Sequence, residues 1–207
     1  MRGVRPSLPA RLLILCLATA GHGTGVENYT YWADPCTAAA ERATACEPGD
    51  TELARWAFEA WQREAGGRLV FTPADSESGA RIRLHWANGQ GNLYGETRPV
   101  LVNSRRGAEI YVLPDTRLLG RDIDAASRAD RLFRDSVVYL TCLHETGHAL
   151  GLEHTAKFDD IMYTFRYGGD IAAYFGRYRK LLKTRPDIRL FSGVSGADRA
   201  ALNEILP

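Results

Sequence analysis

The chain has few cysteines, histidines and methionines, and it has almost no excess of charge of either sign. Its 207 residues include four cysteines, five histidines and two methionines. The 26 lysines and arginines nearly balance the 25 aspartates and glutamates, so the charge gives no reason to expect a nucleic acid or an acidic polymer as partner. No internal repeat, second domain or low-complexity linker is visible. These absences favour one globular domain and leave the oligomeric state undecided.

Long apolar runs are also lacking. Residues 1–20 begin with three arginines, continue through the short apolar run Leu12–Leu17 and end in the small residues Ala18–Ala20. This pattern is typical of a signal peptide and is too short to span a bilayer; a disordered tail is the alternative. Cleavage would leave 23 basic against 25 acidic residues, since three arginines would be lost. We therefore expect a secreted protein, periplasmic in a Gram-negative host, without stable membrane insertion.

Three cysteines follow the leader. In an oxidising compartment Cys36 and Cys46 are expected to close a small disulfide loop, which ties down an otherwise irregular segment over residues 21–49. Cys142 is interpreted as a buried thiol. The main domain is then expected over residues 50–207.

Three of the five histidines fall in one eleven-residue stretch, His144–His154, which reads H-E-x-x-H-x-x-G-x-x-H. His144 and His148 are four residues apart and share a helix face. Glu145 lies beside them as a candidate general base, and Gly151 lets the chain leave the helix and bring His154 back. Three imidazoles leave the fourth position of a tetrahedral zinc ion for water, whose pKa the metal lowers toward about 7.

Met162 and Tyr163 follow the three histidines closely. Together with the histidine motif, this step resembles the matrixins, the branch of the metzincins that includes matrix metalloproteinases. The resemblance runs from about Asp50 to Leu206 and is specific over residues 144–163. It implies an α+β metzincin (zincin-like) fold, with a twisted mixed sheet, an active-site helix, a backing helix and a C-terminal helix. It also implies that Met162 forms a supporting turn beneath the zinc ligands.

Hydrophobic periodicity places the other elements. A helix is expected from Asp50, as its N-cap, to Ala65, and the active helix from Asp130 to Leu150. Extended stretches are expected at 68–72, 80–86 and 108–113, with a polar connection at 117–129. His85 alternates with arginines and is interpreted as solvated. With no histidines to spare, we expect no second, structural zinc, and Ca²⁺ sites remain possible but unsupported.

The glycine-rich stretch at 89–95 leads into an expected edge strand above the cleft, by the same resemblance. A free strand edge can pair with an extended peptide, which makes Leu93, Tyr94, Gly95 and Tyr163 candidate substrate-binding residues. An ordinary connecting loop is the alternative.

Two further helices are expected near the end of the chain. Asp170–Arg185 has aromatic residues at helical spacing and a basic opposite face. It is interpreted as a solvated helix over packed aromatics, with a flap beside the substrate pocket or a helix on a membrane surface as alternatives. Residues 196–206 form the last helix, with Ser195 as its N-cap.

These residues together predict a zinc endopeptidase acting on a protein or peptide substrate, with Glu145 as general base. One alternative takes the third ligand from Glu204, the only glutamate after Glu153. The other is a non-catalytic, zinc-stabilised binding module with a vestigial site.

Overall fold

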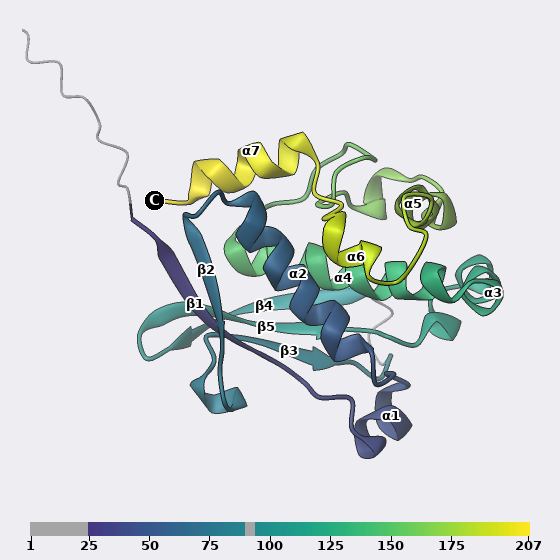
Figure 1. The fold of residues 1–207 in the computed structure, drawn as a ribbon, viewed down its shortest axis with the longest axis horizontal. Helices are drawn as coiled ribbons and strands as arrows, with labels where there is room; N and C mark the ends of the chain where they lie inside the picture. The colour runs from purple at the N-terminus through teal and green to yellow at the C-terminus, as the bar shows by residue number, and fades with distance from the viewer. Residues whose placement is uncertain (1–24, 90–93) are drawn as a thin grey trace, which may run out of the picture.

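Five strands form the sheet on which the helices pack (Figure 1). The structure is a computed structural model that describes residues 25–89 and 94–207. The strand order is β2-β1-β3-β5-β4, in which β4 is antiparallel to β5 and the other neighbours are parallel. The strands are β1 Glu27–Ala33, β2 Leu69–Pro73, β3 Ile82–Trp86, β4 Gly95–Val102 and β5 Arg105–Val112. This is the mixed-sheet α+β architecture expected from the sequence.

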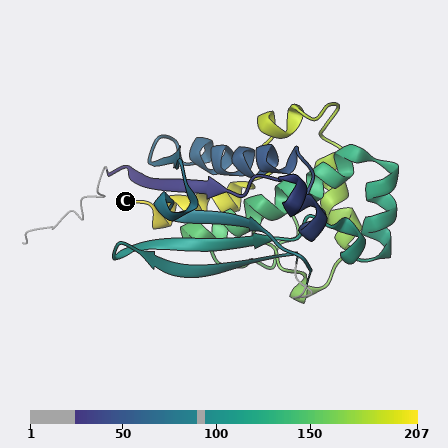
Figure 2. The same ribbon diagram turned by 90° about the horizontal axis from the view of Figure 1, so that it is seen from below.

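Helices α2 and α4 cover one face of the sheet, and the view from below separates the strand layer from the helices (Figure 2). Within the described ranges, no helix has the length and hydropathy needed to cross a membrane. The helices are α1 Ala38–Thr44, α2 Asp50–Glu64, α3 Arg121–Ala129, α4 Arg131–Leu150, α5 Ile171–Arg179, α6 Asp187–Leu190 and α7 Gly196–Ile205, with 3₁₀ turns at Glu77–Gly79, Thr116–Leu118 and Phe165–Tyr167.

The core lies between the sheet and these two helices. On β3, Ile82, Leu84 and Trp86 are buried while the residues between them are partly exposed, the alternation expected of a half-buried strand. Trp61 of α2 is fully buried and its indole N–H donates to the carbonyl of Leu143 at 2.8 Å. That bond ties the backing helix to α4 one residue before the first histidine of the motif.

The segment before Asp50 differs from expectation. Residues 27–33 were expected to be irregular, but they form β1, which lies between β2 and β3. Tyr29 and Tyr31 bury their rings against the core, so the strand is held by its alternate aromatic residues. The predicted disulfide between Cys36 and Cys46 is present, and Cys142 is a buried free thiol as expected. The proposed leader, residues 1–20, lies outside the described residues.

One helix boundary was also wrong, and one helix was missed. Gly49 is the N-cap of α2, and Asp50 is the first helical residue; its buried carboxylate pairs with the guanidinium of Arg134. The buried ion pair uses the carboxylate that was expected to cap the helix. The supposed polar connection at 117–129 contains α3, held by Ile123, which is buried.

The remaining corrections concern charged residues. His85 is only partly exposed, because its Nε2 lies 2.8 Å from a carboxylate oxygen of Glu109 and its ring stacks on Tyr111. Asp170 does cap α5, but the helix ends at Arg179 instead of Arg185. The guanidinium of Arg179 pairs with Asp130, so part of the basic face serves the packing of α5 near the start of α4.

Candidate metal centre

Helix α4 carries the first two histidines on one side. The carboxylate of Asp130 caps its N-terminus by accepting hydrogen bonds from the backbone N–H groups of Leu132 and Phe133, which sets where the helix begins. The four-residue spacing places His144 and His148 one turn apart. Their rings meet edge to face, with centroids 4.8 Å apart. The helix thus presents two imidazoles to one point.

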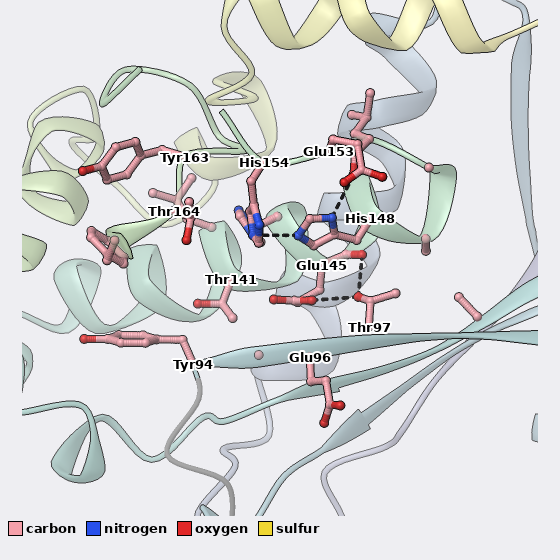
Figure 3. Close-up of a pocket in the computed structure, with 18 of the residues that line it drawn as sticks. Tyr94, Glu96, Thr97, Thr141, Glu145, His148, Glu153, His154, Tyr163 and Thr164 are labelled. Atoms are coloured by element: carbon pink, nitrogen blue, oxygen red, sulfur yellow. Dashed lines mark hydrogen bonds between the residues drawn. The ribbon is translucent and has the colours of Figure 1, made fainter. Parts of the chain in front are cut away.

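The third histidine returns to that point because the helix ends sharply. Gly151 has φ of +109°, a conformation that side-chain-bearing residues rarely adopt. The backbone N–H of Leu152 donates to the carbonyl of Gly147 at 3.0 Å. After this reversal, Nε2 of His154 lies 3.3 Å from Nε2 of His144 and 3.0 Å from Nε2 of His148; Figure 3 shows the second pair.

The hydrogen bonds of the rings test whether the triad fits a metal ion. Nδ1 of His144 lies 2.6 Å from the carbonyl oxygen of Ile161, and Nδ1 of His148 lies 2.8 Å from that of Leu152. A carbonyl oxygen only accepts, so each Nδ1 carries the proton and each Nε2 presents a lone pair. Nε2 of His154 faces both and has at most one proton to donate.

A cation bound between the three nitrogens would accept their lone pairs, which otherwise repel one another. Tetrahedral Zn²⁺ with Zn–N bonds of about 2.0–2.1 Å holds its ligand atoms roughly 3.3 Å apart, close to the two separations measured from Nε2 of His154. Within the described part of the chain, His144, His148 and His154 are the group whose ligand atoms could hold an ion, all lying within 4.8 Å of one another. The residues present therefore fit zinc. Glu204, the alternative third ligand, is exposed on α7 and is not part of this group.

Burial favours the neutral form of His144 and His154. It lowers the pKa of His144 to about 3, with a further lowering from the neighbouring His148. The pKa of His154 is also lowered, first by burial and then by His148 and Arg166. Neutral imidazole is the form that ligates metals, so both rings are ready to bind at neutral pH.

The turn that contains Met162 is held from below by α7. The carboxylate of Asp198, itself buried, accepts hydrogen bonds from the backbone N–H groups of Ile161 at 2.8 Å and Met162 at 3.2 Å. The carbonyl of Ile161 in turn accepts from His144. Met162 is 1% exposed and packs against Gly147, where any side chain would meet its sulfur. The turn therefore orients a ligand ring as well as filling the core.

Glu145 lies between the histidines and β4. Its side chain is buried, and one carboxylate oxygen, Oε2, accepts a hydrogen bond from the hydroxyl of Thr97 at 2.7 Å (Figure 3). Burial raises the pKa of Glu145 to about 7, against the lowering effect of the Thr97 hydrogen bond, and Glu96 adds to the rise. A carboxyl group with this pKa can both take and give a proton near neutral pH.

Comparison with known protein families agrees with this geometry. Residues 119–171 match the family model described as matrixin. This part of the chain is matrixin-like. The match covers α3, α4, the histidine triad and the Met162 turn, and over these residues it confirms the resemblance that the sequence suggested. A match to this family is evidence for a zinc-binding site and for the metallopeptidase class. No curated protein matches the chain.

The matrixin-like centre opens into a cleft of about 790 Å³. Tyr94 and Thr97 of the β4 side face His148, His154 and Tyr163 across it (Figure 3), and Gly95 also lines it. Of the candidate substrate-binding residues, Tyr94, Gly95 and Tyr163 line the cleft, whereas Leu93 lies outside the described residues.

Aromatic rings border one end of the cleft. The ring of Tyr94 lies 6.0 Å from that of Phe165 and 5.9 Å from that of Phe175, measured between centroids. Phe175 belongs to α5, and Ile171 of the same helix also lines the cleft. Helix α5 therefore borders the cleft, as the flap interpretation expected, while its buried aromatics pack against the core.

Sequence reasoning missed three residues here: Thr97, Phe165 and Asp198. Thr97 is 48 residues from Glu145, and no local pattern announces their contact. Asp198 is 37 residues from Ile161 and 36 from Met162, so its role is equally hidden from a local pattern. Phe165 lies just after the Met162 turn. Its position in the sequence therefore indicated that it could reach the cleft, but its residue type alone did not.

Proposed function

We propose that this chain is an exported zinc-dependent endopeptidase. The carrying observation is that three imidazole lone pairs converge beside the buried carboxyl of Glu145 in an open cleft. When bound, Zn²⁺ would supply an activated water and polarise the carbonyl of the peptide bond. The matrixin-like segment supports the peptidase class, and the disulfide and the proposed leader support export.

The free edge of β4 favours an extended peptide as substrate. The N–H of Leu113 donates to the carbonyl of Tyr94 at 2.9 Å, so Tyr94 bonds toward the neighbouring strand. Because antiparallel strands alternate, Gly95 and Thr97 then aim their backbone groups away from β5. Pro99, the next residue of this set, has no N–H to offer. A peptide can therefore pair with Gly95 and Thr97, beside the histidines.

The chain's own residues divide the remaining work. The strand edge holds the peptide backbone, and the aromatic end of the cleft receives an apolar side chain. Glu145 takes a proton from the attacking water and gives it to the leaving nitrogen. A pKa near 7 suits both steps.

Peptide-library cleavage by the zinc-loaded protein, with Glu145→Gln as its matched blank, tests this proposal. We expect internal cleavage by the parent protein, and a fall in kcat of about 10²–10⁴-fold in the variant with its zinc retained, because a general base is removed. A well-folded, zinc-loaded parent that cleaves no peptide would favour the non-catalytic binding module.

A further inference from the structure

Thr97 touches the candidate base from the opposite rim of the cleft. Its hydroxyl oxygen lies 2.7 Å from Oε2 of Glu145 and 2.9 Å from the backbone carbonyl oxygen of the same residue. Both of these oxygens accept hydrogen bonds, so the single hydroxyl proton is always directed to Glu145. In Figure 3 the other carboxylate oxygen points away from Thr97, into the cleft. The contact thus fixes one oxygen and leaves the other free to act.

Gly95 limits the same side chain from a second direction. A Cβ built on Gly95 would lie 2.6 Å from both Cγ and Oε1 of Glu145 and 2.8 Å from its Cδ. Gly95 does not have a positive φ, so glycine is required here for space and not for backbone conformation. Two positions of one strand therefore define where the carboxylate lies, one by a hydrogen bond and one by close packing.

These are also the two residues whose backbone groups face the open edge. Side chains at 95 and 97 share one face of β4, since side chains alternate along a strand. That face meets α4, while the free edge of the same residues borders the cleft. A peptide paired with this edge is consequently held by the residues that hold the base.

We propose that Thr97 is a positioning residue, an inference that rests on the proposed function. Thr97 orients the Glu145 carboxylate. Together with Gly95, it keeps this base aligned with a peptide docked on β4. Thr97 does not touch the metal ligands in any hydrogen bond of the described residues. Its effect is therefore expected on turnover and not on metal binding.

The decisive variant is Thr97→Val, which keeps the shape of the side chain and removes the donor. We expect kcat to fall about 10–100-fold, the cost of a catalytic group displaced by a fraction of an ångström to one ångström. KM should stay within about twofold and zinc should remain at one ion per chain. Thr97→Ser, which restores the hydroxyl, should recover kcat to within about threefold. Thr72→Val, on the exposed part of β2, is the matched control and should leave kcat unchanged.

Gly95→Ala supplies an independent measurement through the packing contact. The added methyl should displace the carboxylate and lower kcat with zinc retained. The effect of Gly95→Ala on the thermal midpoint should vanish in a Glu145→Ala background, because the Glu145 side chain that the methyl would clash with is absent. An equal loss of stability in both backgrounds would mean that Gly95 acts through something other than Glu145.

The outcomes separate this inference from the proposed function. A parent protein without peptidase activity would overturn both. An active parent with an equally active Thr97→Val variant overturns the positioning role alone. A Thr97→Val variant that loses zinc, or whose KM rises while kcat is kept, also overturns it, and so does failure of Thr97→Ser to recover turnover.

Discussion

The two rims of the cleft are built in different ways. The rim with the metal ligands comes from one continuous segment, residues 144–163, whose helix, glycine turn and Met162 turn bring three rings together. The opposite rim is β4, which reaches Glu145 only because the sheet and α4 pack face to face. The ligands are therefore placed by local chain geometry, and the base is placed by a tertiary contact.

This difference determines what a substitution can damage. Within the metal-binding segment the ring of His148 is held by Leu152 and the ring of His144 by Ile161, both on the same segment. A ligand substitution should therefore abolish binding without disturbing β4. On the β4 rim, substitutions should alter turnover while the ion stays bound. The following experiments test that separation.

The largest effect is expected for His154→Ala. Loss of a ligand should reduce zinc affinity by more than the roughly 10–100-fold that loss of an outer partner costs, and activity should fall with it. Equilibrium dialysis against zinc gives the affinity. Glu204→Ala is the control, since its side chain is exposed on α7. Zinc retained by His154→Ala but lost by Glu204→Ala would show that Glu204, and not His154, is the third ligand.

Asp198→Ala should come next, and it probes whether the metal-binding segment depends on a distant element after all. The substitution leaves the buried N–H groups of Ile161 and Met162 without their acceptor, at about 1–3 kcal/mol for each unsatisfied group. We expect a loss of about 3 kcal/mol in the free energy of unfolding, measured by urea titration, and a drop in zinc affinity through His144. Unchanged affinity would show that α7 supports the fold only.

The smallest effect on the site is expected from the double substitution Cys36→Ser and Cys46→Ser. The disulfide closes a loop of ten residues' separation far along the chain from the ligands. Its loss should lower the free energy of unfolding by about 2–3 kcal/mol and leave zinc stoichiometry and kcat unchanged. A fall in kcat at temperatures where the variant is folded would couple β1 and α1 to the cleft, against the separation proposed here.

The same division explains how much the sequence could predict. The histidine motif, Gly151 and Met162 were recognisable because the helix period and the turn requirement tie each residue type to a fixed spacing. The extent of α4 from about Asp130 followed from its apolar periodicity, and the cap of α7 at Ser195 followed from capping preferences.

What escaped prediction depends on contacts between distant segments. Nothing local marks Thr97 as the partner of Glu145. Strand β1 was missed because it is held by pairing with β2 and β3, which lie far along the chain. Helix α5 was predicted too long because Leu181, which continued its apolar spacing, is exposed beyond the actual end of the helix. Periodicity indicates where a helix can run, whereas packing decides where it stops.

Titration of zinc into chelator-treated protein, with peptide cleavage followed at each addition, tests the central claim most directly. If His144, His148 and His154 share one ion beside Glu145, activity should rise linearly and reach its plateau at one zinc per chain. Cleavage that persists in the metal-free protein, or that never returns although one zinc binds with the histidines intact, would contradict the account.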